Sequence, residues 1–520
     1  MDRELRLTER GLARRDFLKY SVLSAASLSA ANLLAACGSS STPATVKKAG
    51  EVIYGEGGTE TSINPLQTLG HSESYACFDA LTYVDPTRDG AVFPRLATSW
   101  TRLDDVTMEF KLRSGVKFSD GSAMTADDVK FSYDTTISEK LAVFSEVSKI
   151  ASVDVVDPLT VRIVTQSPDP LLERRASLLF IVPKSVYSSV GTKGFEQSAV
   201  GTGKYKVVDY TPGQVIHMEA NPHSWNGQPA TPKFTWQMFS TPAACMDALL
   251  AGQVDFTDFT GGSGIADQLT AFNTLSAQVG GPRNIRLDTT KPPFNNPTVR
   301  MAMNYAIDVE TLSKTVNKGF GVPLAGQLPT AQCFGYDPSI KAFGFDQAKA
   351  KSLLAQAGYA NGFSTSIASA LTYHDLMVGI AGYLQQIGIT ATVVDQSFTT
   401  FIGNFFSGTT EPMWMYGANF SPLYDADLSF QWMTAPIPPA TGTRSWIDPN
   451  WDQMLTQERS TIDTATRLGQ LRAMSAYLHD QVPVVFLDSQ SYLYAWSKKV
   501  HNFNPSTGFF FLADTMTKDA

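Results

Sequence analysis

Hydrophobic and polar residues alternate with a period of two between Thr107 and Arg113. Met108, Phe110 and Leu112 are apolar, and the residues between them are polar or charged. This spacing is typical of a strand with one buried face. Similar short runs predict further strands at residues 51–57, 152–156, 160–165, 254–256, 389–394 and 483–487.

Helical periods with capping residues alternate with these strands. Thr125 and Asp128 have the spacing of an N-terminal capping box and predict a helix that starts after Thr125. Asn296 can cap a second helix with Pro297 at its first position and a buried stripe of Val299, Met303 and Ala306. Further helices are predicted at 242–251 and 348–357, and amphipathic helices are predicted after Pro449. Helices that alternate with strands indicate an α/β fold built in layers.

Composition narrows the class of protein. The chain has 520 residues, 43% of them hydrophobic, which is enough for more than one core. Its formal net charge is −8 and its pI is near 5.4. Nucleic acid is not expected as a partner, because phosphate binding depends on clustered Lys and Arg.

The first 36 residues are predicted to be an export signal. Arg14 and Arg15 form a twin-arginine pattern, and the apolar run at 22–36 is short for a membrane span, which needs about 20 residues. The sequence Leu-Ala-Ala-Cys at 34–37 resembles a lipobox and predicts lipidation of Cys37. An ordinary signal peptide with an incidental cysteine is the alternative. The Ser- and Thr-rich stretch that follows, to residue 50, is predicted to be a flexible tether.

The other cysteines and the histidines give no metal-binding pattern. Cys77, Cys245 and Cys333 lack a C-x-x-C spacing, so at most one disulfide can form among them, and the sequence does not select the pair. The six histidines are far apart in the chain. We therefore expect no metal and no cofactor.

Motifs of common enzyme classes are missing from the sequence. The chain contains no H-E-x-x-H, no G-x-S-x-G and no P-loop; Gly201, Gly203 and Lys204 lack the P-loop order. We expect a protein that is not an enzyme, with a hydrolase whose residues meet only in space as an open alternative.

Several phrases carry a resemblance to one family. They are Leu-Ala-x-Ser-Trp at 96–100, Phe-Lys-Leu-Arg-x-Gly-Val-Lys-Phe-x-Asp-Gly at 110–121, Thr-Ala-Asp-Asp-Val at 125–129, Ala-Gly-Gln-Val-Asp-Phe at 251–256 and Lys-Pro-Pro-Phe-Asn-Asn-Pro-Thr-Val-Arg at 291–300. Together they resemble the family 5 solute-binding proteins, the extracytoplasmic receptors of peptide, nickel and some sugar or opine ABC transporters.

The resemblance implies a fold and a division of the chain. The fold is α/β, the two-lobed periplasmic binding protein fold (type II, cluster C), with an extra inserted domain in the first lobe. The first lobe would consist of residues 51–89, 199–288 and 485–520, the inserted domain of 90–198 and the second lobe of 289–484. The lobes would close around a ligand by a hinge motion.

The resemblance also implies ligand-binding positions. Tyr416 and Asn419 stand where peptide-binding relatives carry an aromatic residue and an aspartate that pairs with the ammonium group of the peptide. A hydrogen bond to a charged group is worth about 1.5–3 kcal/mol, against about 1 for a neutral one, so an asparagine would weaken this anchor unless Asp425 or Asp258 replaces it.

Other candidates come from their side-chain chemistry. Arg286 can bind a carboxylate through two parallel hydrogen bonds, although exposure at the surface is its simpler interpretation. Asn64 lies in a polar loop. The aromatic candidates, which suit either stacking on a ligand or core packing, are Trp414, Phe420 and Trp432.

The expected function is capture of an oligopeptide or peptide-like ligand and its delivery to an ABC permease with its ATPases. A sugar, an opine or a metal chelate is the alternative within the family, and a chaperone-like surface lipoprotein is an alternative outside it. We expect an exported monomer at the periplasm or cell surface, in contact with the membrane only through a lipid anchor at Cys37.

Overall fold

A single mixed sheet connects most of the strands in the computed structural model. The model describes residues 50–58, 62–68, 72–85, 90–260, 268–417, 423–431, 433, 445–504 and 513–519. Across the sheet the strands are β15 (Ile389–Gln396), β14 (Phe363–Ala370), β16 (Met413–Gly417), β12 (Asn273–Leu287), β17 (Val484–Trp496), β11 (Phe256–Thr260), β1 (Glu51–Glu56), β10 (Lys233–Met238), β9 (Val215–Ala220) and β8 (Tyr205–Thr211), with β13 (Gly321–Pro323) paired to β17.

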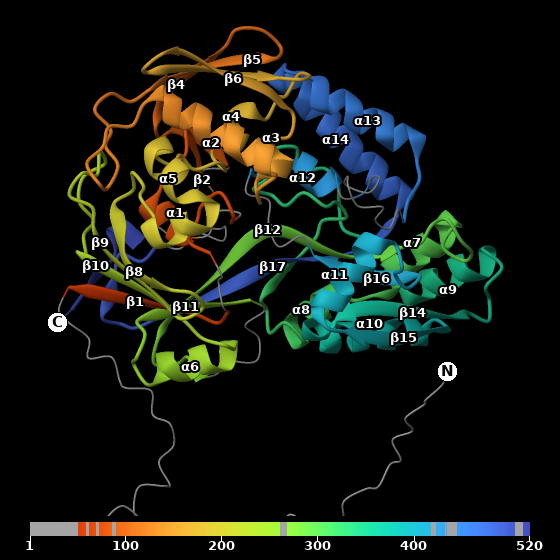
Figure 1. Cartoon of the computed structure of the whole chain (residues 1–520). Helices are drawn as coiled ribbons and strands as arrows, with labels where there is room; N and C mark the ends of the chain where they lie inside the picture. Colours follow the sequence, from red (N-terminus) through yellow and green to blue (C-terminus); the bar gives the residue numbers. More distant parts are fainter. Residues whose placement is uncertain are drawn as a thin grey trace, which may run out of the picture. The chain divides into compact units, whose positions relative to one another are not determined.

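The long antiparallel pair β12 and β17 links the two ends of this sheet (Figure 1). The register of the pair shifts between Gln278 and Asn284, which marks an irregular stretch where the strands leave regular pairing. We call the part with β1 and β8–β11 lobe I, and the part with β14–β16 lobe II.

A separate four-stranded antiparallel sheet lies within residues 97–165. Its β5 strand buries Met108, Phe110 and Leu112, as the alternating pattern predicts. The sheet has the order β4 (Ala97–Arg102), β5 (Thr107–Leu112), β7 (Thr160–Thr165) and β6 (Ile150–Asp157), while β2 (Thr82–Asp85) and β3 (Ala91–Pro94) form a hairpin beside it.

The helices cover the sheets in groups that follow the chain. Near the separate sheet are α2 (Ala126–Glu139), α3 (Phe144–Val147), α4 (Leu172–Arg175) and α5 (Lys184–Gly194), while α1 (Ser72–Cys77) and α6 (Pro242–Leu250) pack on lobe I. Lobe II carries α7 (Pro297–Ala306), α8 (Val309–Thr315), α9 (Gln347–Gln356), α10 (His374–Gln386) and α11 (Phe398–Ser407). The last helices are α12 (Ala426–Gln431), α13 (Pro449–Ser460) and α14 (Thr464–Gln481).

Sequence and structure agree closely at these elements, with two differences. Strand β17 extends to Trp496, nine residues beyond the predicted end at 487. Strand β11 begins at Phe256 and not at residue 254. The Asp255 carboxylate accepts a hydrogen bond from the Ile53 amide at 2.9 Å and pairs with Lys518 at 3.0 Å. These contacts hold Asp255 in the turn that precedes the strand.

Asp128 joins the starts of two helices. Its Oδ2 accepts a hydrogen bond from the Thr125 amide at 2.8 Å, and its Oδ1 accepts one from the Lys184 amide at 2.9 Å. The first contact confirms the predicted capping box of α2. The second, which the local sequence does not indicate, ties α2 to the first residue of α5.

Removing this carboxylate should destabilise the protein measurably. We expect Asp128→Ala to lower the free energy of unfolding by about 2 kcal/mol, because two helix-terminal amides lose their acceptor. Asp127→Ala at the exposed neighbouring position is the matched control and should change it by less than about 0.5 kcal/mol. Urea unfolding of both variants compares the two values, and equal effects would contradict the role of Asp128.

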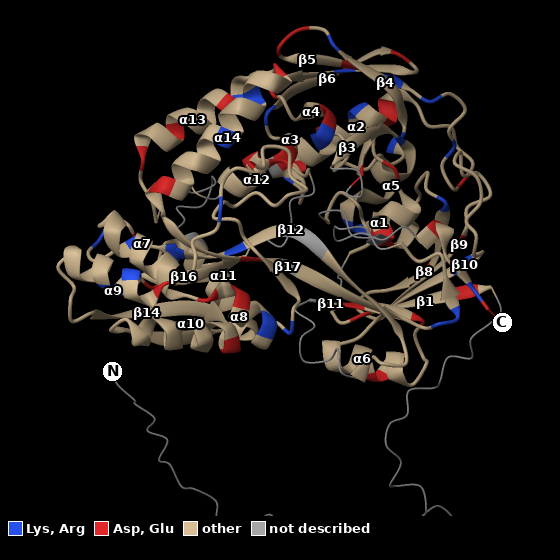
Figure 2. Ribbon diagram, turned by 180° about the vertical axis from the view of Figure 1, so that it is seen from behind, with Lys and Arg blue, Asp and Glu red and all other residues tan. Residues whose placement is uncertain are grey.

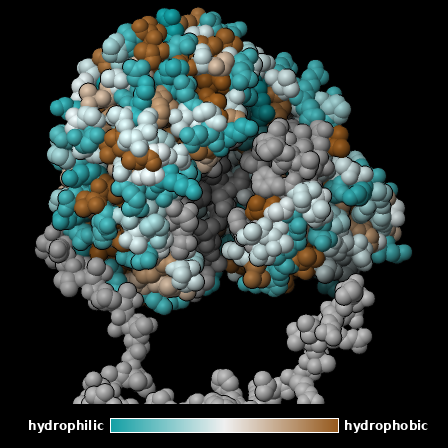
Figure 3. All heavy atoms as spheres, in the orientation of Figure 1, coloured by the Kyte–Doolittle hydropathy of each residue, from teal (hydrophilic) through white to brown (hydrophobic). Residues whose placement is uncertain are grey.

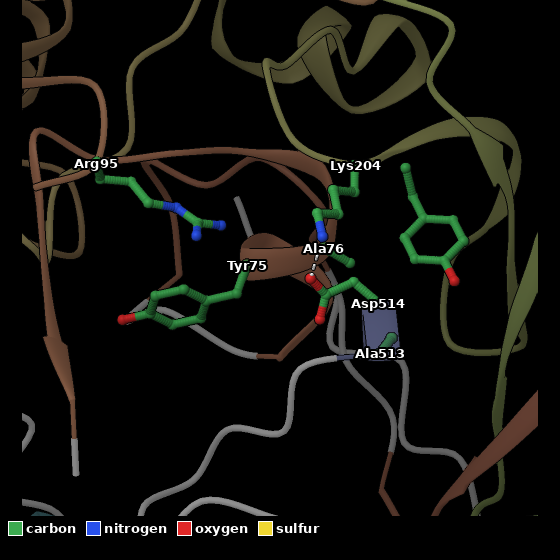
Figure 4. A pocket seen from close by; sticks show the side chains of 7 residues that line it. Tyr75, Ala76, Arg95, Lys204, Ala513 and Asp514 are labelled. Atoms are coloured by element: carbon green, nitrogen blue, oxygen red, sulfur yellow. Dashed lines mark ion pairs between the residues drawn. The ribbon is translucent and has the colours of Figure 1, made fainter. Parts of the chain in front are cut away.

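The C-terminal segment packs on lobe I near Lys204. Figure 4 shows Lys204 pointing at Asp514, and the two form an ion pair at 2.7 Å. Beside them lies a cavity of about 10 Å³, which has room for about one water molecule and no solute. The ion pair of Lys204 therefore connects the C-terminal segment to lobe I.

The surface and the cysteines show no further specialised feature among the residues described. Acidic and basic residues are interspersed along the ribbon in Figure 2, and apolar residues are scattered on the face shown in Figure 3. Cys77, Cys245 and Cys333 are buried, and no disulfide joins them. Within the described part, no helix combines the length and the apolar character that crossing a membrane requires.

Candidate functional site

Four side chains from two neighbouring strands of lobe II lie together. Arg286 of β12 is the cross-strand partner of Trp414 of β16, and Asn284 is the partner of Tyr416. Opposed side chains on one face of a sheet are direct neighbours. We call these four residues the β12–β16 cluster.

Arg286 is buried at the centre of the cluster. The residue is only 2% exposed, so the surface interpretation is wrong, because β12 runs between β16 and β17. The guanidinium carbon lies 4.6 Å from the centre of the Tyr416 ring, within the range of a cation–π contact. Its Nη1 contacts the sulfur of Met433, which is a weak acceptor.

Polar atoms of the cluster lack partners within the described part of the chain. They are Arg286 Nη2, Asn284 Oδ1, Asn284 Nδ2 and Trp414 Nε1. Each buried polar atom without a partner costs about 1–3 kcal/mol. Such groups on one face are typical of a site that an incoming polar ligand completes.

The charge of Arg286 is also uncompensated within the described part. Burial lowers the pKa of Arg286 to about 10, against the opposing effect of Tyr416, so the side chain remains protonated at neutral pH. The segments that adjoin Tyr416 and Met433 in the chain, at 418–422, 432 and 434–444, contain no Asp or Glu. The cluster is therefore suited to an anionic group from outside the chain.

Asp258 occupies a different place, in lobe I. It lies on β11 opposite Tyr494 of β17, it is partly exposed, and the Tyr54 hydroxyl donates a hydrogen bond to it. Burial raises the pKa of Asp258 to about 6, although the hydrogen bond from Tyr54 opposes the rise.

Two other candidates have partners within the protein. The Asn64 amide donates to the Tyr187 hydroxyl at 3.0 Å and to the Thr192 carbonyl at 2.9 Å. Asp425 accepts two hydrogen bonds from Arg467, both at 2.7 Å, and is fully buried. In this structure both side chains connect elements of the fold.

The remaining predicted positions cannot be compared with the fold. Asn419, Phe420 and Trp432, as well as Cys37, Arg14 and Arg15, lie outside the described residues.

Asn284 was missed by the sequence analysis. The alternation of polar Asn284 and Arg286 with apolar Ile285 and Leu287 is a signal for it, since the apolar pair packs in the lobe II core with α7 and α10.

Helices α12 and α13 of the C-terminal half meet α4 through a buried charged cluster. Asp427 pairs with Arg459 at 2.6 Å and lies 3.8 Å from Arg175. Arg175 also pairs with Asp169 at 3.2 Å and with Glu146. A shared apolar group, made of Val143, Leu171, Leu178, Leu423 and Leu428, lies at the same contact.

Glu458 lies beside Asp427 inside this cluster, and its carboxyl group keeps its proton in the folded protein. Burial, followed by the charge of Asp427, raises the pKa of Glu458 far above its ordinary value. Burial would also raise the pKa of Asp427, but Arg459 and Arg175 outweigh it and lower that pKa.

This arrangement predicts a loss of stability as pH rises. Above pH about 4.5 the unfolded chain releases the Glu458 proton while the folded protein keeps it, so unfolding becomes easier as the pH increases toward the raised pKa. Glu458→Gln keeps a neutral donor and should remove that part of the pH dependence. The midpoints of urea unfolding from pH 5 to 9 measure this pH dependence. If the midpoints of Glu458→Gln and of the unmodified protein change with pH in parallel, Glu458 does not keep its proton in the folded protein.

No set of three or more His, Cys, Asp or Glu in the described ranges is arranged to hold a metal ion. Two surface pockets of about 440 and 430 Å³ are lined by other residues and include none of the candidates. The β12–β16 cluster is therefore identified by its unsatisfied polar atoms and its charge.

Comparison with solved structures identifies the fold. NikA from Brucella suis, in complex with Fe(III)-EDTA, is similar with a TM-score of 0.80 at 21% identity, over 90% of this chain and 100% of that chain. DppA from Helicobacter pylori, an ABC transporter-associated periplasmic binding protein in complex with the peptide STSA, gives 0.73 at 22% identity, over 91% and 98%. These similarities confirm the expected two-lobed periplasmic binding protein fold.

Sequence comparison agrees over almost the same length. The glutathione-binding protein GsiB of Pectobacterium atrosepticum is 28% identical over 496 residues, which cover 90% of this chain and 92% of that protein. The family described as bacterial extracellular solute-binding proteins, family 5 Middle, matches residues 91–448. The match includes β12 and β16 with their cluster, and the chain accordingly belongs to the family 5 solute-binding proteins, the receptors of ABC importers.

Proposed function

We propose that this receptor binds a peptide-like ligand between its lobes and holds the ligand's carboxylate at Arg286 and Asn284. The observation that carries the proposal is the buried, protonated guanidinium whose Nη2 lacks an acceptor among the described residues. A carboxylate would accept from Nη2, and the Asn284 amide would donate to it. Both unsatisfied groups would then be paired.

The relatives support an acidic ligand. GsiB is described as binding glutathione, and DppA was solved with a peptide. Both ligands carry a free carboxylate, and the EDTA chelate in the NikA complex is also built from carboxylates. A neutral sugar would leave the charge of Arg286 without a counterion, which makes it the weaker candidate.

The test begins with what the protein carries. The chain without residues 1–37 is purified, and ligand released by mild denaturation is identified by mass spectrometry. Calorimetry then compares alanine peptides of two to six residues with their C-terminal amides. We expect the free acids to bind at least about 10-fold tighter, because a hydrogen bond to a charged group is worth about 1.5–3 kcal/mol. Equal affinities of acids and amides would refute the proposed carboxylate site.

Export and anchoring form a second part of the proposal. The twin-arginine pair Arg14 and Arg15 would direct export, and lipid at Cys37 would hold a monomer at the outer face of a membrane. In cell fractions, Cys37→Ala should move the protein from the membrane to the soluble fraction. If the variant stays in the membrane fraction, the anchor at Cys37 is wrong.

The receptor is proposed to have no catalytic activity. Its relatives are named for the ligands that they bind. Incubation of the purified chain with the same alanine peptides should leave them uncleaved, and turnover would favour the hydrolase alternative.

A further inference from the structure

A peptide also carries an ammonium group, and most acidic side chains near the sheet already have a cation. Asp255 pairs with Lys518, Asp488 with Arg283 and Asp425 with Arg467. Asp258 has no ion pair among the described residues. Unlike these three carboxylates, Asp258 therefore has no cation beside it in the described part of the chain.

Asp258 is placed where ligands reach such sheets. Strand β11 is parallel to β1, and β1 is parallel to β10. Asp258 is the middle residue of β11, two residues before the carboxyl end of this strand. In open α/β sheets, ligands bind in the crevice outside the carboxyl ends of the strands.

Aromatic residues surround Asp258 on the same face of lobe I. Tyr54 donates its hydroxyl hydrogen bond to Asp258, and the Tyr54 ring lies 4.4 Å from that of Trp236 and 4.9 Å from that of Phe256. Tyr494 opposes Asp258 across the strands. Rings around a partly exposed carboxylate limit its contact with water and strengthen its attraction for a cation.

The chain that follows β11 brings no cation of its own. Residues 261–267 read Gly-Gly-Ser-Gly-Ile-Ala-Asp, without Lys, Arg or His. The titratable groups near Asp258 include the phenols Tyr54 and Tyr494 and the thiol of Cys245. Burial raises all three pKa values above their ordinary values, so the three groups are neutral at physiological pH. Because the pKa of Asp258 is about 6, its negative charge at neutral pH has no counterion there.

We propose that Asp258 binds the ammonium group of the ligand, so that lobe I holds the positive end and lobe II holds the carboxylate. This proposal rests on the proposed function. Peptide-binding relatives use an aspartate at the position of Asn419 to pair with the ammonium group, and the proposal gives this role to Asp258 of the other lobe. The ligand is then a zwitterion. A ligand that joins opposite charges of two lobes binds the closed state more tightly than the open one, which is what drives closure.

The separation of the two charges bears on ligand length. Asp258 is opposite Tyr494 of β17, and Arg286 is opposite Val484 of the same strand. These positions are ten residues apart, which corresponds to at most about 33 Å in a fully extended strand. Extended peptides of several residues are therefore expected to bind better than dipeptides.

The experiment uses N-acetylation to remove the charge from the ligand and Asp258→Asn to remove it from the protein. The probes are the alanine peptides of two to six residues that have free carboxylates, each with a free and an acetylated N-terminus. The amide oxygen of the substituted side chain would still accept the Tyr54 hydrogen bond, so the fold is retained. Tyr54→Phe removes only that hydrogen bond, and Asp209→Asn on exposed β8 is the matched charge control.

We expect acetylation to weaken binding to the unmodified protein by about 10- to 100-fold. The affinity of Asp258→Asn for the free peptides should be lower by a similar factor. Acetylation of the peptides should then have little further effect on their binding to this variant. Asp209→Asn should keep the full effect of acetylation, and Tyr54→Phe, which leaves the Asp258 carboxylate in place but removes a neighbour of it, should keep part of the effect. The difference between the effects of acetylation in the unmodified protein and in Asp258→Asn should be largest for the longest peptides.

The outcomes separate this inference from the proposed function. If acetylation weakens binding equally in the unmodified protein and in Asp258→Asn, the ammonium group is bound elsewhere and the inference is overturned. The proposed carboxylate site would still stand if C-terminal amides bind weakly. If neither end of the peptide affects binding, both proposals fail.

Discussion

Replacing Asp488 with asparagine is expected to lower the free energy of unfolding by about 3–5 kcal/mol, the cost of leaving a buried charge without its partner. Asp488 Oδ1 accepts from Arg283 Nε at 2.5 Å, and Oδ2 accepts from Nη2 at 2.6 Å. Both side chains are 3% exposed. Burial would lower the pKa of Arg283, but the Asp488 carboxylate outweighs it and raises that pKa.

The position of this ion pair explains why its loss should be costly. It joins β12 to β17 within the irregular stretch where Pro282 pairs with Ser489 and Asn284 with Phe486. Asn317 adds a hydrogen bond to Asp488 Oδ2 at 2.9 Å. At this point the Arg283–Asp488 ion pair connects β12 to β17 where regular backbone pairing is interrupted. These two strands are shared by lobes I and II.

Urea unfolding of Asp488→Asn measures the loss. Asp519→Asn is the matched control, because its 2.9 Å pair with His501 is 65% exposed at the carboxylate and should change the unfolding free energy by less than about 1 kcal/mol. Similar losses in the two variants would show that burial does not set the strength of the Arg283–Asp488 pair.

Local elements of the fold follow from sequence because their determinants are a few residues apart. The alternation in β5, the capping box of α2 and the Asn296 cap of α7, which accepts from the Thr298 amide at 2.9 Å, all depend on neighbours in the chain. The family phrases also predicted the two-lobed fold. Both kinds of signal can be read without knowing which strands pair.

The candidate site was less predictable because its partners are distant in sequence. Arg286 could be assigned to the surface or to a carboxylate site until β16 and β17 were placed on either side of β12. Asp425 was a candidate to bind the ammonium group in place of the aspartate that Asn419 replaces. Its carboxylate is paired with Arg467, which is 42 residues away in the sequence. Pairing of charges across lobes and layers depends on tertiary structure, which no local pattern encodes.

Replacing Arg286 with methionine is expected to weaken binding and, at the same time, to stabilise the protein without ligand. Methionine fills similar space without charge. The free energy of unfolding should stay equal or rise by about 1–3 kcal/mol, because a buried charge without a counterion opposes folding. Affinity for alanine peptides with a free carboxylate should fall about 100-fold, since truncating one partner of a buried charge pair costs about 2–5 kcal/mol.

Opposite signs in stability and affinity distinguish a ligand-binding residue from a structural one. Thermal unfolding gives the first quantity, and calorimetry with the free peptides and their amides gives the second. C-terminal amides, which carry no terminal carboxylate, should bind Arg286→Met and the unmodified protein about equally. Arg286→Lys keeps the charge but cannot form two parallel hydrogen bonds. Its affinity for the free peptides should therefore lie between those of the unmodified protein and Arg286→Met. If Arg286→Met unfolds more easily and binds peptides unchanged, the guanidinium supports the fold of lobe II, and the ligand carboxylate must be sought at another cation.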